Sequence, residues 1–186
     1  DGHDFIYVIS KYDAGNISAA LKKFRYLQLT NFTPESITEF SINGENGLIK
    51  MKYQENAVHA DVYGVISNWK MSQPHSYDAD NEAVEKLVLT PISNIVAMDV
   101  LEDSLKAISK NRMPYSFELT ADGKKYSFRA SFDKEYAYVY SEEKAITYIV
   151  SPASLSFLSI SFFDVAERFL SIIDLNTLDT ATVTAK

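Results

Sequence analysis

One internal similarity constrains the fold more than any other feature of the sequence. Residues 39–64 align without a gap on residues 116–141, at a constant offset of 77 positions. Apolar residues meet apolar residues along this alignment, as where Phe40 meets Phe117. Few of the aligned residues are identical, so we interpret the similarity as a repeat of structure, which constrains every later step of fold assignment.

Each copy of the repeat is expected to form antiparallel strands joined by tight turns. Apolar positions alternate along both copies, and Gly, Asn and Asp residues that favour turns separate the alternating runs. The strands expected in the first copy span residues 38–43, 48–54 and 57–70. Those expected in the second span residues 115–120, 125–132 and 135–141. A fourth strand is expected after each copy, at residues 86–89 and 145–150.

Helices are expected before, between and after the two copies. Pro91 and Pro152 follow the two fourth strands, and proline cannot donate a hydrogen bond to a β-ladder. Asn16, Asp99 and Ser161 each stand where a helix cap is favoured, with apolar residues at helical spacing behind them.

These elements predict an α+β fold in which a helix packed on a four-stranded antiparallel meander occurs twice in tandem, with an additional C-terminal helix. Residues 1–92 form the first helix-plus-meander unit, and residues 93–186 form the second unit with the C-terminal helix and tail. The two units are expected to make one compact body. This element order resembles the cystatin-like arrangement, and its duplication resembles the β-lactamase inhibitory protein architecture. The resemblance implies a concave double sheet that displays aromatic residues to a protein partner.

The C-terminal helix is expected to have a wide apolar surface. Two adjacent stripes run along it at helical spacing: Phe162, Val165, Phe169 and Ile172, and beside them Phe163, Ala166, Leu170 and Ile173. So wide a surface favours two packing partners, which places the helix between the two units or against the second. The alternative is a core helix that packs on a single sheet.

Composition excludes several classes of function. The chain of 186 residues has 25 acidic and 18 basic residues, and its net charge of −7 disfavours binding to a nucleic-acid backbone. It has no cysteine, which excludes disulfides, thiolate metal sites and cysteine nucleophiles. No apolar run approaches the ~20 residues of a transmembrane helix. The sequence begins without an initiator methionine, so we favour a processed, secreted or cell-envelope protein over a cytoplasmic one.

No arrangement of titratable residues supports a named reaction. The three histidines, His3, His59 and His75, are not at the spacing of a helical metal site. The six glycines are scattered and form no phosphate-binding loop. We therefore expect no catalytic residue, no metal ligand and no cofactor, and we do not expect an enzyme.

One strand face carries the residues most suited to binding. Tyr136, Tyr138 and Tyr140 alternate with small apolar residues, so the three tyrosines are expected on one side of the sheet. Tyr, Trp and Arg dominate the hot spots of protein interfaces. The predicted partner-binding site comprises Tyr63, Trp69, Tyr136, Tyr138, Tyr140, His59, Asp61 and Arg129. Tyrosine also favours strands, so the alternative is that the rings only cover the sheet.

The sequence therefore predicts a non-enzymatic module that binds a protein partner through this aromatic face. One alternative is a carrier of a small apolar ligand or lipid, with an interior pocket lined by Phe128, Phe132, Phe162, Phe163 and Phe169. Another is a chaperone-like assembly factor that uses the apolar surface of the last helix. The sequence leaves the oligomeric state open.

Overall fold

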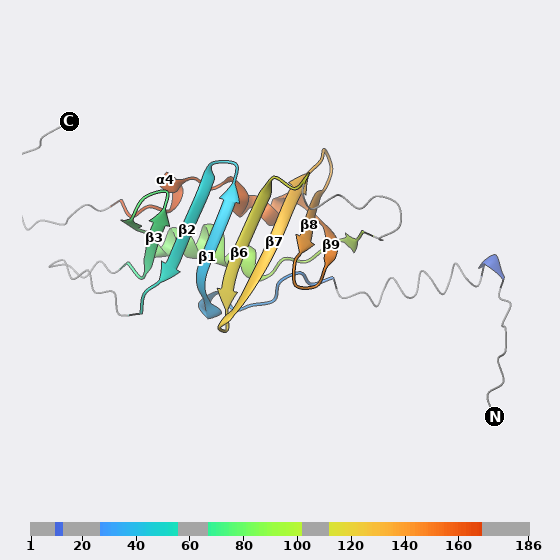
Figure 1. Ribbon diagram of the computed structural model, residues 1–186, viewed down its shortest axis with the longest axis horizontal. Coiled ribbons are helices and arrows are strands. Elements are labelled where there is room, and N and C mark those ends of the chain that lie inside the picture. The colour runs from blue at the N-terminus through green and yellow to red at the C-terminus, as the bar shows by residue number, and fades with distance from the viewer. Residues whose placement is uncertain (1–9, 13–26, 56–66, 102–111, 169–186) are drawn as a thin grey trace, which may run out of the picture.

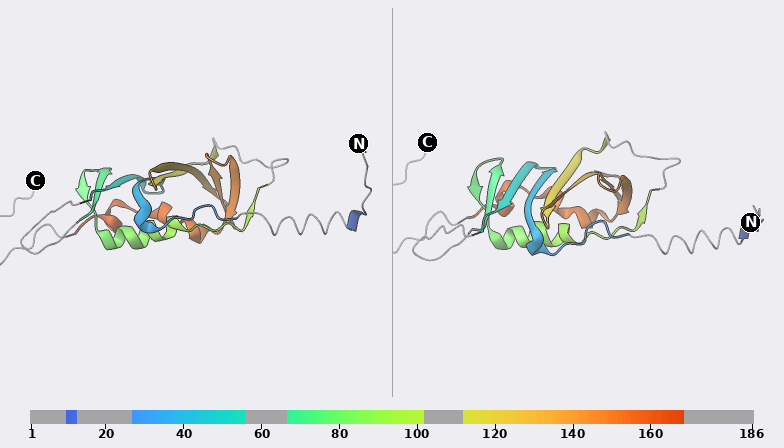
Figure 2. Two further views of the ribbon diagram at one scale, coloured as in Figure 1. Left: turned by 90° about the horizontal axis from the view of Figure 1, so that it is seen from below. Right: turned by 60° about the horizontal axis from the view of Figure 1, so that its bottom comes forward.

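Nine antiparallel strands form one continuous sheet in the computed structural model, which describes residues 10–12, 27–55, 67–101 and 112–168 (Figure 1). The strand order is β4-β3-β2-β1-β6-β7-β8-β9-β5. The strands are β1 (Ile37–Gly44), β2 (Gly47–Tyr53), β3 (Trp69–Gln73), β4 (Tyr77–Asp78), β5 (Asp99–Val100), β6 (Tyr115–Ala121), β7 (Lys124–Phe132), β8 (Ala137–Ser141) and β9 (Ile146–Val150). The short helices of the chain lie against one face of this sheet, which arches over them (Figure 2).

The expected tandem of two helix-on-four-strand units is wrong. Strands of both copies belong to the same sheet, because β1 of the first copy pairs directly with β6 of the second. Two separate meanders would each expose the edge of their first strand, and an unpaired edge leaves a row of backbone hydrogen-bonding groups unsatisfied. Pairing β1 with β6 removes both edges, so the two copies merge into one layer.

The hairpins at the centre of the sheet share one register. In hairpin β1–β2, Phe40 pairs with Met51, and in hairpin β6–β7 the residues 77 positions later, Phe117 and Phe128, pair in the same way. All four side chains are almost fully buried. The apolar alternation of the sequence therefore predicts the pairing as well as the strands of both hairpins.

The two hairpins are related by an approximate two-fold axis. Ser41 on β1 pairs with Glu118 on β6, which is its own equivalent 77 positions later. On either side of this pair, each residue of β1 from Glu39 to Asn43 pairs with the β6 equivalent of the β1 residue that lies equally far on the other side of Ser41. The relation ends after the second strands, where β2 pairs with β3 beginning at Trp69, while β7 pairs with β8 beginning at Ala137. Residues 57–66 of the strand expected over 57–70 lie outside the described residues.

A continuous helical segment crosses the covered face of the sheet. It begins with α2 (Asn81–Val84), continues through the wider π-helical turn η2 (Glu85–Leu89) and ends with α3 (Thr90–Ser93). The strand expected at residues 86–89 is therefore wrong. Val84, Val88 and Ile92 recur every four residues and are fully buried, which is the spacing of one helix face.

Local chemistry explains both the start and the wide turn of this helix. The Asp80 side chain accepts hydrogen bonds from the backbone N–H groups of Glu82 and Ala83, as an N-cap residue does. Pro91 has no backbone N–H, and its ring crowds the carbonyl group four residues earlier. The wider turn η2 ends at Leu89, two residues before Pro91, which is where such crowding would widen a helix.

The C-terminal part of the described chain also departs from expectation. The helix α4 (Phe162–Val165) begins at Ser161, whose backbone N–H and hydroxyl both donate to Asp164 Oδ2 at 2.7 Å. The expected long helix is nevertheless wrong, because Ala166 is extended and forms a β-bridge with Ala79. The later residues of its apolar stripes, from Phe169 onward, lie outside the described residues, as do those of the helix expected from Asn16.

Asp99 also begins a strand instead of a helix. It opens β5, which pairs with β9 at the end of the sheet. Residues 102–111, on which the rest of that expected helix falls, are outside the described part of the chain. No helix within the described ranges is long and apolar enough to cross a membrane.

Two short 3-10 segments, η1 (Pro34–Ser36) and η4 (Pro152–Ser159), complete the layer. The backbone of η4 lies directly on Gly44, and the Glu45 N–H donates to the Leu158 carbonyl at 2.8 Å. Phe157 of η4 meets Phe117 edge-on, with ring centroids 5.1 Å apart. The core therefore lies between the sheet and the helices, and the other face of the sheet is polar.

Candidate functional site

Strand β8 presents tyrosines on the face of the sheet opposite the helices. Ala137 and Val139 are fully buried in the core, and Tyr138 and Tyr140, which alternate with them, are partly exposed on the other side. No segment among the described residues covers that side (Figure 2). Tyr136, with 37% of its surface exposed, directly precedes the strand.

Asp133 fixes the position of Tyr138. The Tyr138 hydroxyl donates to Asp133 Oδ2 at 2.8 Å, while Asp133 Oδ1 accepts the backbone N–H groups of Tyr136 and Glu135 at 2.7 and 2.8 Å. These backbone and hydroxyl donors lower the pKa of Asp133. The same hydrogen bond to the carboxylate raises the pKa of Tyr138. The phenol is therefore neutral and held in one orientation by a charged acceptor.

Arg129 lies beside Tyr140 across the β7–β8 pair. Its Nε donates to Glu142 Oε1 at 2.9 Å, which holds the guanidinium along the sheet. The structure therefore brings four of the predicted residues to one surface. We call Arg129, Tyr136, Tyr138 and Tyr140 the tyrosine face.

Trp69 does not belong to the tyrosine face. It lies on β3 on the covered side of the sheet, since its neighbour Lys70 pairs with Lys52 on the open side. Only 5% of the Trp69 surface is exposed, and its ring contacts Phe40 and Tyr53 at centroid distances of 5.2 and 5.6 Å. The remaining predicted residues, His59, Asp61 and Tyr63, lie outside the described residues.

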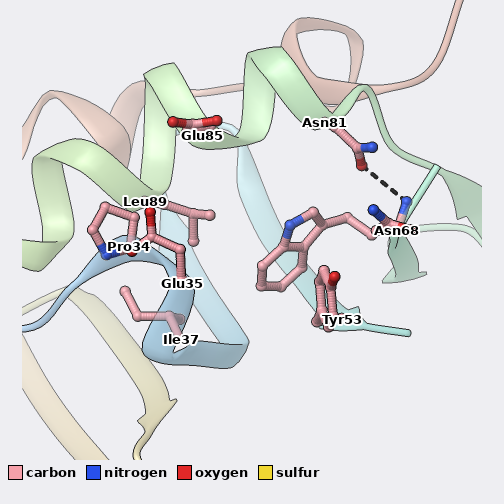
Figure 3. A pocket seen from close by; sticks show the side chains of 9 residues that line it. Pro34, Glu35, Ile37, Tyr53, Asn68, Asn81, Glu85 and Leu89 are labelled. Atoms are coloured by element: carbon pink, nitrogen blue, oxygen red, sulfur yellow. Dashed lines mark hydrogen bonds between the residues drawn. The ribbon is translucent and has the colours of Figure 1, made fainter. Parts of the chain in front are cut away.

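Trp69 instead forms a wall of an open cavity of about 280 Å³ between the strand ends and the helix over residues 81–93 (Figure 3). We call it the Trp69 cavity. It is lined by Pro34, Glu35, Ile37, Tyr53, Asn68, Trp69, Asn81, Glu85 and Leu89. Figure 3 shows that Glu85 and Leu89 come from the helix, Glu35 from the segment that leads into β1, Ile37 from the start of β1 and Tyr53 from the end of β2.

The polar groups of the Trp69 cavity differ in how they are engaged. The Asn68 backbone N–H donates to Asn81 Oδ1 at 2.9 Å and closes one side of the wall (Figure 3). The carboxylates of Glu35 and Glu85 are exposed and form no ion pair or hydrogen bond with any described residue. The lining contains no basic side chain.

Sequence reasoning identified Trp69 but missed the residues around it. The pattern predicts a strand over residues 86–89, which includes Leu89 and directly follows Glu85, so it does not bring these two residues onto a helix beside Trp69. The helical spacing of Val84, Val88 and Ile92 is the signal that would have corrected this.

The phenylalanines proposed as the lining of one interior pocket differ in their surroundings. Phe128 stacks on Phe117 in the core, with centroids 4.7 Å apart. Phe132 contacts Tyr115, whereas Phe162 contacts Tyr77. Phe163 is 75% exposed, and Phe169 is not among the described residues.

The comparisons with known proteins assign the chain to no family. No family model matches it, and no curated protein or solved structure shows significant similarity to it. Within the described ranges, no group of three or more His, Cys, Asp or Glu side chains is placed to hold a metal ion.

Proposed function

We propose that this protein is a non-enzymatic module that binds a protein partner through the tyrosine face. One observation carries the proposal: β8 holds Tyr138 and Tyr140 on a sheet surface that no described segment covers. Tyrosine and arginine are the residue types that contribute most to protein interfaces, where a large ring with few rotatable bonds buries area at low entropic cost.

The hydrogen bonds of the tyrosine face favour tight binding. Tyr138 is held by Asp133, and Arg129 is held by Glu142, before any partner arrives. Side chains ordered in advance lose little conformational freedom on association, which otherwise costs about 0.5–1.5 kcal/mol for each immobilised side chain.

The charges around the tyrosine face favour a protein over a nucleic acid. Two basic side chains of β7, the strand next to β8, are paired within the sheet, since Lys125 pairs with Glu118 at 2.9 Å and Arg129 with Glu142 at 2.9 Å. Binding to a phosphate backbone requires several unpaired lysines or arginines on one surface. A partner that offers apolar side chains among hydrogen-bonding groups suits this face better.

The test compares partner capture by three forms of the protein. Wild type, the double variant Tyr138→Ala/Tyr140→Ala and the control Tyr12→Ala are immobilised and exposed to native lysate and envelope fractions. Tyr12 is the control because it is an exposed tyrosine, at 77%, that belongs neither to the tyrosine face nor to the Trp69 cavity. Loss of a captured protein with the double variant alone supports the proposal.

A second measurement makes the result specific. Hydrogen exchange on the purified complex should show protection of β7 and β8. Thermal unfolding of the double variant should stay within a few degrees of wild type, because its side chains lie outside the core. Equal capture by all three forms, or protection confined to the helical side, would contradict the proposal.

A further inference from the structure

We propose that the Trp69 cavity binds an organic cation of the arginine type: a guanidinium group on an apolar stem that also carries a carbonyl oxygen. This site lies on the opposite side of the sheet from the tyrosine face and shares no residue with it. It therefore stands independently of the proposed function.

The size of the cavity selects a side-chain-sized ligand. Its volume of about 280 Å³ lies just below the ~300–1,000 Å³ range of pockets that hold drug-sized molecules. A lipid chain or a nucleotide needs more space than this. One long amino-acid side chain with its adjoining peptide group is of the right order.

The walls of the cavity exclude an anion and attract a cation. Glu35 and Glu85 are its charged lining residues, and neither is neutralised by a described residue. They come from two different elements, η1 and η2, so a ligand between them meets negative charge from two directions (Figure 3). The net charge of −7 of the whole chain adds a long-range attraction for cations.

The aromatic wall strengthens this selection. Trp69 is held between Phe40 and Tyr53, so its ring is fixed before the ligand binds. Among aromatic side chains, tryptophan attracts a cation most strongly, and guanidinium groups are the cations most often found over such rings. The apolar side chains of Ile37 and Leu89 provide the contact for an aliphatic stem.

A hydrogen-bond donor with no acceptor among the described residues points to the carbonyl oxygen. The indole N–H of Trp69 donates to no described residue, although the side chain is 95% buried. An indole N–H with no acceptor among the described residues favours a ligand that supplies one, and the peptide carbonyl next to an arginine side chain is such an acceptor.

The helix geometry at the cavity is also typical of a binding site. Glu85 and Leu89 are the first and last residues of the wide turn η2. Wide turns of this kind inside α-helices occur frequently at functional sites. Here the turn lies just before Pro91, and it carries one carboxylate and one apolar contact of the cavity.

The test uses Trp69 as its own reporter, because it is the only tryptophan in the chain. Its fluorescence is followed while N-acetyl-arginine-methylamide is added at low salt. N-acetyl-citrulline-methylamide serves as the control ligand, since citrulline has nearly the same shape as arginine and no charge. We expect a saturable change with the arginine derivative and binding at least about tenfold weaker with the citrulline derivative.

Matched variants locate the binding site. Glu35→Gln/Glu85→Gln should weaken arginine binding about five- to tenfold, because each exposed ion pair contributes modestly. Glu82→Gln is the control, since Glu82 is an exposed carboxylate on the same helix and does not line the cavity. All of these substitutions preserve side-chain size at exposed positions, so the melting temperature should stay within a few degrees.

The outcomes are distinct. Equal binding of the arginine and citrulline derivatives, no saturable response to either, or equal weakening by Glu82→Gln would each overturn the proposal. A short peptide with a central arginine identifies the source of the ligand. Tighter binding of the peptide than of the single derivative supports an arginine side chain of a partner, and weaker binding of the peptide supports a free arginine-like molecule.

Discussion

Replacing Gly44 by alanine tests how the helical layer is attached to the sheet. A Cβ atom at Gly44 would lie 1.9 Å from the carbonyl oxygen of Leu158 and 2.8 Å from its carbonyl carbon. Both are backbone atoms, so no side-chain rotation can relieve the contact, and η4 must move away from the end of β1.

The magnitude follows from what that movement breaks. Two hydrogen bonds would be lost or stretched, from Glu45 N–H to the Leu158 carbonyl and from Asn46 Nδ2 to the Ser159 carbonyl. Their loss costs about 1–3 kcal/mol, and the overpacking costs about 1–3 kcal/mol more. Alanine is favoured over glycine in a strand by about 0.5–1 kcal/mol, which offsets part of this. The net destabilisation is about 3 kcal/mol, or a fall in Tm of about 6–12 °C.

Urea unfolding and calorimetry measure this change directly. Gly47→Ala is the control, because Gly47 has a φ of 98° and open space around it. That substitution should cost only the ~1–2 kcal/mol of a left-handed backbone conformation. A Gly44→Ala protein as stable as wild type would refute the reasoning, because it would mean that the Leu158 carbonyl group does not lie against Gly44 in solution.

Three further predictions concern pH, the covering helix and a helix cap. The pKa of Asp133 is lowered in the folded protein, so its contribution to stability is present above its unfolded pKa of ~3.9 and is lost as the pH falls through the folded value. The difference in stability between wild type and Asp133→Asn, measured by urea unfolding, should therefore vanish in acid and persist at pH 7. Ile92→Ala should lower the free energy of unfolding by about 2–5 kcal/mol, whereas Thr90→Ala on the exposed side should change it by less than about 0.5 kcal/mol; equal effects would show that residues 81–93 are not a helix on the sheet. Ser161→Ala should cost about 0.5–1.5 kcal/mol by removing the hydrogen bond that the Ser161 hydroxyl donates to Asp164 at the start of α4, and an unchanged denaturation midpoint would contradict that role.

Strands could be predicted where alternation and turns agree. Both central hairpins have apolar residues at every second position and tight turns between the strands, and the structure confirms these strands. The same alternation separates Ala137 and Val139 in the core from Tyr138 and Tyr140 on the open side. These features depend on neighbours in sequence, so local patterns are sufficient to find them.

The covering helix was missed because two local signals compete within it. Val88 favours a strand, and Pro91 favours a stop, so the local pattern predicts a fourth strand over residues 86–89. The cap at Asp80 and the four-residue spacing from Val84 favour a helix, and burial against the sheet decides between the two. The Trp69 cavity could not be predicted, because its walls come from η1, from the ends of β1, β2 and β3, and from this helix, which are far apart in the sequence.

The pairing of β1 with β6 has the geometry of a symmetric dimer contained within one chain. Ser41 opposite its own counterpart Glu118 is the contact that a two-fold interface makes between identical surfaces. Covalent linkage makes such an association independent of protein concentration. It also allows the two halves to differ in sequence, whereas the subunits of a homodimer are identical. One half carries Trp69 and its cavity, and the other carries the tyrosines of β8, so a single sheet can present two different surfaces to two different ligands.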